Sequence, residues 1–443
     1  MYYKRLFTSS SLLKGVAQLG AASVITRVLG MVNRMYLSRL IGAEGLGLYQ
    51  MVTPFYVLLA VAVSLGLPGA VTKMVAERYA VGDLAGQYRV QKLALKFTLT
   101  AALLVSILFW IVLSMAVEFI PDPRILPALR LMPAAFIFVA ISSILRSFFQ
   151  GRSEMSPLAL SQVGEQLIRI AVGLAAAYWL LPLGLDYAVL GLVIGFVAGE
   201  ACSFGILYLS SQGRHLPALK RLSFKANGNL TREMFTLALP LLVIRLSAAV
   251  TQAIESIIIP SRLQAAGFSP SQATSLFGQL SGMAMPLLFL PTVLIVPLNM
   301  ALVPAIAETV ALNLPERLYR LISFSLISTA VIGGLTWLIL NPFAGVLVQI
   351  IYGSREAAPI VVMLAPLAPL AFLQFTTASI LHGLGKPGVA VANDLAGTAL
   401  SLTIIYYLTA SPLYGIAGVI WGYGAAFSLI SLLDILAIGF NRF

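Results

Sequence analysis

Apolar stretches long enough to cross a bilayer follow one another along almost the whole of this chain. A hydrocarbon core about 30 Å thick is spanned by about 20 helical residues, and stretches of that length are separated here only by short polar breaks. We expect about twelve transmembrane helices, at residues 12–41, 46–70, 93–117, 127–150, 157–181, 187–210, 233–262, 278–305, 318–341, 357–382, 388–409 and 413–440. The predicted fold class is therefore an all-α polytopic membrane protein.

The composition agrees with this interpretation. Only 10% of the residues are charged and 59% are hydrophobic, whereas soluble domains have roughly 25% charged residues. The first span follows basic residues as a signal peptide does, but it continues past signal length into a second span, so we expect it to be retained. The single cysteine, Cys202, is expected to be a small buried residue inside a span.

Basic residues gather in the loops on the side of the amino terminus, which is expected to be cytoplasmic because Lys and Arg favour that side. Among them are Lys4 and Arg5 before the first span, and Arg146 and Arg152 at the end of the fourth. Both termini are then cytoplasmic. The net charge of +12 is explained by this bias and by attraction to anionic membrane lipids, so no nucleic-acid partner is expected.

The longest polar interval among the basic loops falls halfway along the chain, at residues 211–232, and is expected to be a cytoplasmic linker. It separates an amino-terminal six-helix lobe, 1–210, from a carboxy-terminal lobe, 233–443. A weak internal repeat agrees, because GAVTKMVAE from Gly69 and MALVPAIAE from Met300 begin 231 residues apart and end on the same Ala-Glu pair. In transporters built from such repeats, the substrate site usually lies between the halves.

Groups for catalysis are scarce. The two histidines are His215 in the linker and His382 at the end of the tenth span, and the sequence contains no zinc-protease, nucleophile-elbow or phosphate-loop motif. We therefore expect no catalytic residue, no metal site and no bound cofactor. A transporter is favoured over an enzyme.

Charged residues inside the spans carry the functional prediction. Arg27 and Arg34 lie about two turns apart on one face of the first span. A charge at the bilayer centre costs at least a few kcal/mol, so Arg27 is expected to face a wet or anionic cavity. Arg34 and Arg39 are closer to the outer surface, and snorkelling of their side chains to the headgroups is an alternative.

Arg245 repeats this situation in the seventh span, with Gln252 on the same face and Glu255 on its flank. One interpretation is a structural ion pair of Glu255 with Arg245 or Arg27. The other is a cavity in which the arginines outnumber the acid and select an anionic cargo, because a guanidinium fits the oxygens of phosphate or carboxylate. In that case Glu255 is a candidate site for a coupling ion.

Two further pairs favour a structural interpretation. Glu165 and Arg169 have the i,i+4 spacing of a self-neutralising pair within the fifth span. Lys73 and Glu77 end the second span, either as a simple polar helix end or as the inner lip of the cavity.

Several segments resemble a known family in the same order along most of the chain. They are TRVLGMVNR (26–34), FFQGRSEMSPLALSQVGEQLIRI (148–170), LPLLVIRLSAAV (239–250), SGMAMPLLFLPTVLIVPLNMALVPAIAE (281–308) and HGLGKPGVAVAND (382–394). The chain resembles the polysaccharide transporter branch of the multidrug/oligosaccharidyl-lipid/polysaccharide (MOP) exporter superfamily. Within that branch it is most similar to the stage V sporulation protein B-like and MurJ-like group.

This resemblance implies a MATE-like fold of two six-helix lobes around a central cavity, in a bacterial plasma membrane. It implies alternating-access transfer of undecaprenyl-pyrophosphate-linked sugars to the outer leaflet, most closely lipid II for peptidoglycan or spore cortex. Arg27 and Arg34 match the arginines that contact the lipid diphosphate, and Lys73 matches a basic residue ending the second helix. Two features differ from the family. An arginine of the family's eighth helix has no counterpart here, and Arg245 of the seventh span is only a loose substitute for it. The chain also has no room for the two additional helices that form a lipid groove in part of the family.

The sequence leaves three alternatives open. They are a flippase for another lipid-linked polysaccharide unit, a MATE-like multidrug antiporter, and a membrane enzyme of envelope glycans. An antiporter for cationic drugs is expected to carry acids in the first span, where this chain has arginines. Coupling to Na⁺, to a proton or to the membrane potential, and a cell-wall synthase as partner, are all compatible with the sequence.

Overall fold

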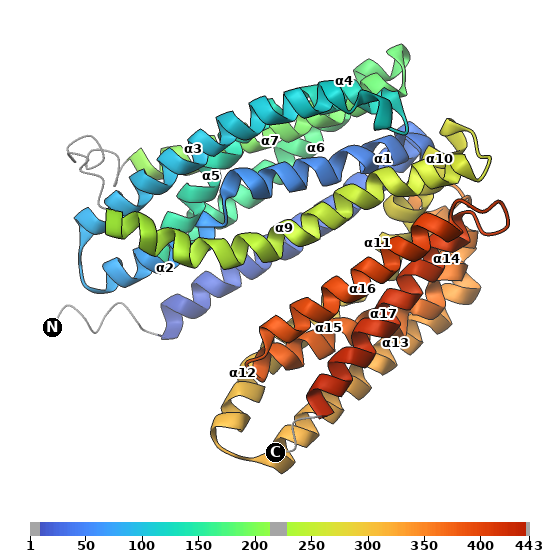
Figure 1. Cartoon of the computed structure of the whole chain (residues 1–443). Coiled ribbons are helices and arrows are strands. Elements are labelled where there is room, and N and C mark those ends of the chain that lie inside the picture. The colour runs from blue at the N-terminus through green and yellow to red at the C-terminus, as the bar shows by residue number, and fades with distance from the viewer. Residues whose placement is uncertain (1–8, 213–227, 440–443) are drawn as a thin grey trace. The chain divides into compact units, whose positions relative to one another are not determined.

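The computed structural model describes residues 9–212 and 228–439, and within these ranges the chain is helical without strands (Figure 1). Most of the predicted linker 211–232, including His215, lies outside the described residues. Eleven described helices are long and apolar enough to cross a membrane, and the first of them is two helices joined at a kink. The prediction of an all-α protein with about twelve transmembrane helices is therefore confirmed.

The helices follow the predicted spans closely. Before the linker they are α1 (Ser9–Ser64), α2 (Leu67–Ala80), α3 (Leu84–Met115), η2 (Val117–Phe119), η3 (Pro123–Ile125), α4 (Leu126–Leu131), α5 (Pro133–Gly151), α6 (Met155–Leu180), η4 (Leu181–Leu183) and α7 (Leu185–Gln212). After it they are α9 (Gly228–Ala265), α10 (Pro270–Phe277), the π-helix η5 (Gly278–Ala284), α11 (Met285–Leu288), α12 (Thr292–Ala311), α13 (Pro315–Tyr352), α14 (Ala358–Leu364), η6 (Ala365–Leu367), α15 (Ala368–Gly383), α16 (Pro387–Leu408) and α17 (Ile416–Gly439). Helices predominate because backbone groups in a bilayer must find hydrogen-bond partners within the segment.

Helix α1 contains the first two predicted spans, which meet at Gly42. This residue has φ 65° and ψ −172°, a conformation that residues with a Cβ rarely adopt. The second part of α1 ends at Ser64, where Leu65 and Gly66 have positive φ, and α2 begins a new helix at Leu67. The predicted end of this span at residue 70 was therefore several residues too late.

The chain forms two compact units. The first runs to Ile41 and from Met51 to Ala253, and the second contains Gly42–Gln50 and the chain from Ile254 onward. These units do not coincide with the lobes 1–210 and 233–443 expected from the linker. The first part of α9 packs within the first unit, where a Cβ built on Gly66 would lie 2.4 Å from the carbonyl oxygen of Ala238.

Each unit has its own apolar core. In the first unit, α2, α3, α5 and the start of α9 meet around the fully buried Met74, Val90, Ile144 and Met234. In the second unit, α12, α13 and α15 meet around Ile306, Leu318 and Ile380. Thr329 and Thr376, which are 2.9 Å apart, add a buried hydroxyl contact between α13 and α15.

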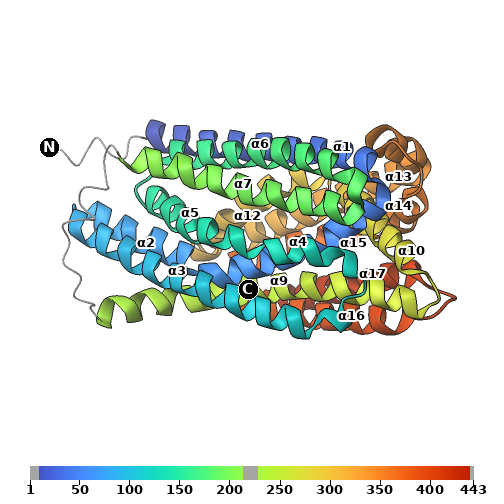
Figure 2. The same ribbon diagram turned by 90° about the horizontal axis from the view of Figure 1, so that it is seen from above.

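Helices α6 and α7 pack along each other through small residues (Figure 2). A Cβ built on Gly195 would lie 2.6 Å from both the carbonyl oxygen of Arg169 and the Cα of Gly173. A Cβ on Gly191 would lie 2.5 Å from the backbone nitrogen of Ala177. Small residues let two backbones approach closely in a membrane, and this approach brings the polar side chains of the two helices together.

We predict that Gly195→Ala destabilises the protein by about 1–3 kcal/mol, because the new methyl group overpacks this contact. Gly205→Ala on the same helix is the matched control, since nothing lies within 4 Å of its Cβ position. The control is expected to be neutral or to stabilise the protein by up to about 1 kcal/mol. Thermal unfolding in detergent measures both, and equal melting temperatures for the two variants would contradict the packing described.

Candidate functional site

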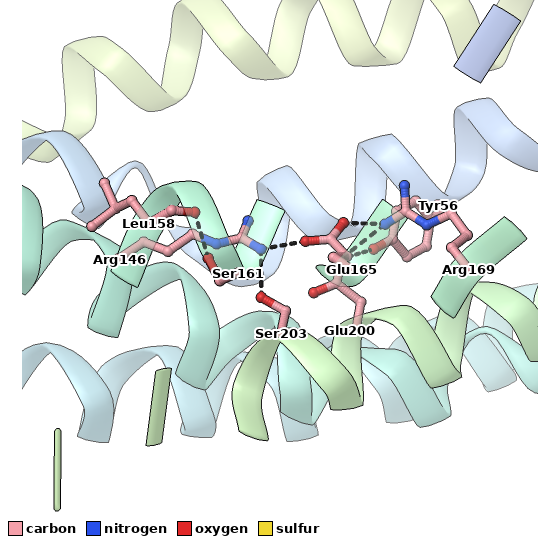
Figure 3. Close-up of polar contacts among 8 residues, drawn as sticks. All are labelled: Tyr56, Arg146, Leu158, Ser161, Glu165, Arg169, Glu200 and Ser203. Atoms are coloured by element: carbon pink, nitrogen blue, oxygen red, sulfur yellow. Dashed lines mark hydrogen bonds and ion pairs between the residues drawn. The ribbon is translucent and has the colours of Figure 1, made fainter. Parts of the chain in front are cut away.

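The interior of the first unit holds a network of four charged side chains (Figure 3). Glu165 of α6 lies between Arg146 of α5 and Arg169 of α6 and forms an ion pair with each. Arg169 Nη2 also lies 3.6 Å from Glu200 Oε1 of α7. Arg146 Nη2 donates a hydrogen bond to Ser203 Oγ at 2.5 Å. Two positive and two negative charges make the network neutral as a whole.

Aromatic side chains close one end of this network. The Tyr56 hydroxyl donates a hydrogen bond to Glu200 Oε1 at 2.6 Å, and its ring stacks on Phe196 with centroids 4.8 Å apart. The Arg169 guanidinium carbon lies 4.9 Å from the centroid of the same Phe196 ring, a favourable cation–π geometry. The glutamate side chains are only 12% and 9% exposed. The network therefore ties α1, α5, α6 and α7 together in an interior with little water.

The sequence predicted part of this network. The Glu165–Arg169 pair is confirmed. The sequence did not predict that Arg146, near the end of α5, is directed into the unit and forms an ion pair with Glu165. Glu200 and Tyr56 were missed, since neither has a charged partner at helical spacing on its own helix. The sequence feature that could have identified Glu200 is its position as a lone acid in an apolar span.

Helix α1 runs beside α6 (Figure 2). Ser156 Oγ donates a hydrogen bond to Gln18 Oε1 at 3.1 Å, and a Cβ built on Gly30 would lie 3.7 Å from Gln166 Nε2. Gln166 follows Glu165 directly in α6. Arg27 and Arg34 therefore lie about one turn on either side of the network's level. Arg27 is exposed, and Arg34 is half-buried.

The other predicted basic residues also belong to the first unit. Arg245 lies in α9, about one turn beyond Leu241, whose Cδ1 would be 2.5 Å from a Cβ on Gly69 of α2. Lys73 lies one turn further along α2, with its Nζ 3.8 Å from Glu77 Oε1. Both side chains are exposed.

The basic residues Arg27, Arg34, Arg245 and Lys73 do not contribute to the charge balance of the network. Glu165 and Glu200, the two acids of the network, face Arg146 and Arg169. Among the described residues of the first unit, Arg27, Arg34 and Arg245 have no ion-pair partner. The membrane-spanning part of the first unit therefore has uncompensated positive charge.

Acidic groups line a cavity of about 190 Å³ in the second unit. Glu255 accepts a hydrogen bond from the Tyr423 hydroxyl at 3.3 Å, and Asp394 accepts one from Gln374 Nε2 at 3.2 Å. Among the described residues of the second unit, neither acid has an ion-pair partner. Residues 9–212 and 228–439 contain no group of three His, Cys, Asp or Glu side chains arranged to hold a metal ion.

Solved structures with this fold are MOP superfamily transporters. The chain aligns over 97% of its length with the whole of an inward-facing multidrug resistance MATE family transporter, with a TM-score of 0.75 and 14% identity. A MOP superfamily transporter from Pyrococcus furiosus, described as having a binding pocket of reverse polarity, aligns over 97% of this chain and 95% of its own, with a TM-score of 0.64 and 15% identity. The chain therefore has the fold of this class of membrane transporter.

Sequence comparisons identify the family within that class. A family model described as polysaccharide biosynthesis protein matches residues 12–310, and the chain belongs to this family. Stage V sporulation protein B of Bacillus subtilis is 35% identical over 430 residues, which cover 95% of this chain and 82% of that protein. Lipid II flippase MurJ of the same organism is 25% identical over 426 residues, covering 89% and 77% of the two chains.

We predict that Glu165 and Arg146 are strongly coupled in stability. Glu165→Gln leaves two half-buried guanidinium groups without their shared partner, and breaking a fully buried pair costs about 3–5 kcal/mol, so a cost of a few kcal/mol is expected. In a double-mutant cycle with Arg146→Met, the coupling energy is expected to exceed about 1 kcal/mol. The measurement is chemical or thermal unfolding in detergent.

The exposed pair Arg317–Glu308, with nitrogen and oxygen 3.6 Å apart, is the matched control. Its coupling energy is expected to be about 0–1 kcal/mol, because surface pairs gain little. A coupling no larger at Glu165–Arg146 than at this surface pair would argue against a buried network.

Proposed function

We propose that this protein is a flippase that moves undecaprenyl-pyrophosphate-linked sugar precursors from the inner to the outer leaflet of a bacterial plasma membrane, with both termini cytoplasmic. Lipid II is the proposed cargo, and Arg27, Arg34 and Arg245 are the proposed ligands of its diphosphate. The observation that supports this proposal is the uncompensated positive charge of the first unit. A cell-wall synthase that uses the delivered precursor is a proposed partner.

The chemistry of the three arginines fits a diphosphate. An arginine presents a planar fork of donors that binds two phosphate oxygens at once. A lipid diphosphate brings negative charge to the depth of the membrane where Arg27 lies, about 22 Å along the helix from the break at Gly42. Charge neutralisation there is favourable because a lone guanidinium in the hydrocarbon region is costly.

The rival functions receive less support. A multidrug antiporter for cationic compounds needs acids where α1 has Arg27 and Arg34. A flippase for a different lipid-linked polysaccharide would use the same diphosphate site, so only the glycan distinguishes it from the main proposal. An envelope-glycan enzyme would need catalytic groups, whereas the buried acids of the first unit are engaged with arginines.

Lys73 is proposed to act earlier, where cargo first meets the protein. A groove of about 390 Å³ within the first unit is lined by Lys73, Glu77, Asn229, Arg232, Glu233, Thr236 and Leu237. It lies at the ends of α2 and α9 that adjoin the cytoplasmic linker. Its two cations, which two carboxylates balance, can donate hydrogen bonds to a phosphate that enters from this side.

Coupling is proposed to use the acidic cavity of the second unit. Glu255 and Asp394, together with the hydroxyl of Ser401 and the amide of Gln374, offer oxygen ligands for Na⁺ or a carboxylate for a proton. The membrane potential alone is the alternative driving force. No bound organic cofactor is part of the proposal.

We predict that Arg27→Ala lowers lipid II movement in proteoliposomes at least about tenfold, because a charge-assisted hydrogen bond contributes about 1.5–3 kcal/mol. Arg245→Ala is expected to act in the same direction. Arg320→Ala, at an exposed position of α13, is the control and should leave transport unchanged. Normal transport by a folded Arg27→Ala protein would refute the assigned role of Arg27.

Glu255→Gln is predicted to remove the dependence of transport on an imposed Na⁺ or proton gradient, because the amide keeps the shape but loses the charge. Basal movement of cargo without a gradient should persist. The measurement compares initial rates with and without each gradient in vesicles held at zero membrane potential. A Glu255→Gln protein that still responds to the gradient as the unaltered protein does would show that coupling lies elsewhere.

A further inference from the structure

A glutamine side chain of α6 lies against α1 between the two arginines of that helix. The Nε2 atom of Gln166 is 3.7 Å from the Cβ position of Gly30. Gly30 is three residues after Arg27 and four residues before Arg34. Residues at these spacings share one face of a helix. The amide of Gln166 therefore meets α1 on the face that carries both arginines.

Helices α1 and α6 run side by side in the same direction (Figure 2). Near the start of both helices, a Cβ built on Gly15 would lie 2.9 Å from Met155 Cγ. Further along both helices, Gly30 meets Gln166. The two helices therefore advance together, and a residue of α6 can be placed at a level of α1 from its rise along the helix.

A second glutamine belongs to the same face of α6. Gln162 is one turn before Gln166, so the two residues are neighbours on the helix surface. One turn before Gly30 on α1 is Arg27. Gln162 therefore lies at the level of Arg27, and Gln166 lies at the level between Arg27 and Arg34.

The two glutamines have unused hydrogen-bonding groups. Both side chains are half-buried, and neither forms a hydrogen bond with another residue that the structure describes. Their neighbours Glu165 and Arg169 are engaged in the charged network. Each glutamine amide offers two donors and one acceptor, and polar groups with little access to water are costly unless they are paired. Two such amides beside the arginines are suited to a polar ligand.

Gly30 leaves room for a ligand beside these amides. Glycine within a helix is destabilising relative to alanine, so its presence needs a reason. Gly191 and Gly195 let the backbones of α6 and α7 touch, whereas no backbone of another described helix lies within 4 Å of the Gly30 Cβ position. Close helix packing therefore does not explain Gly30. Glycine also occurs where a ligand approaches a backbone closely.

We propose that Gln162 and Gln166 bind the sugar unit attached to the cargo diphosphate, with the sugar lying over Gly30. The inference rests on the transport function proposed above and assigns a second part of the cargo to the first unit. A diphosphate only accepts hydrogen bonds and is bound by the donors of Arg27 and Arg34. Sugar hydroxyl groups both donate and accept, and a neutral amide matches both roles.

This arrangement divides recognition of the cargo between two kinds of side chain. The arginines bind any polyprenyl diphosphate, and the glutamines select the cargo by its glycan. A sugar bonded directly to the diphosphate must occupy a site next to the arginines. The level of Gln166, between Arg27 and Arg34, meets that requirement.

Binding of two lipids to the purified full-length protein tests this proposal. Lipid II carries the glycan, and undecaprenyl diphosphate lacks it. We expect Gln166→Ala to lower the affinity for lipid II about three- to tenfold, the size of a neutral hydrogen bond, and to leave the affinity for undecaprenyl diphosphate unchanged. Unchanged affinity for lipid II, or an equal loss for the two lipids, would overturn the sugar assignment.

The matched control is Gln18→Ala in the same pair of helices. Gln18 accepts a hydrogen bond from Ser156 of α6 and lies more than two turns before Arg27. Its replacement should change neither affinity, and thermal unfolding establishes that both variants are folded. A loss of lipid II binding equal to that of Gln166→Ala would mean that the contact between α1 and α6 is being measured, and would count against the proposal.

Gln166→Glu tests the placement of this side chain without any sugar. A carboxylate beside Arg27 and Arg34 pairs with them and repels a diphosphate, so we expect the affinity for undecaprenyl diphosphate to fall at least tenfold. An unchanged affinity would show that residue 166 does not lie beside the arginines and would overturn the proposal. Failure of the unaltered protein to bind either lipid would instead refute the proposed function, which separates the two outcomes.

Discussion

A bilayer interior offers no water to a charged side chain, and this constraint organises the first unit. Glu165 and Glu200 can carry charge there because Arg146 and Arg169 face them. A tyrosine and a serine complete the hydrogen bonds of the network. The close glycine packing of α6 against α7 is what brings these groups within reach of each other. The neutral network is thus a product of helix packing as much as of charge.

The same constraint gives meaning to the charges outside the network. Since the buried acids are engaged, the arginines of α1 and α9 have no compensation within the described part of the first unit, and an anionic ligand would supply it. The second unit has the opposite character, because Glu255 and Asp394 line a cavity without an ion-pair partner among the described residues of that unit. We therefore assign anion recognition to the first unit and cation coupling to the second.

The fold was largely predictable from sequence, and the site only in part. Spans of apolar residues located nearly every helix, because the bilayer sets their length. The Glu165–Arg169 pair was predictable because its partners lie on one helix face. Arg146, Glu200 and Tyr56 join it from other helices, and no local spacing reports such a contact. The arginines of α1 were visible in sequence, but the approach of Gln166 to Gly30 between them depends on how α1 packs against α6.

The central claim is that the uncompensated arginines of the first unit hold a lipid diphosphate. It is tested most directly by equilibrium binding of undecaprenyl diphosphate, undecaprenyl monophosphate and undecaprenol to the purified protein over a range of salt concentrations. The account predicts that the diphosphate binds at least about tenfold more tightly than the alcohol, and that this preference weakens with salt and is lost when Arg27 and Arg245 are both replaced by glutamine. Equal affinity for the three lipids, or a preference that survives the replacement, would contradict it.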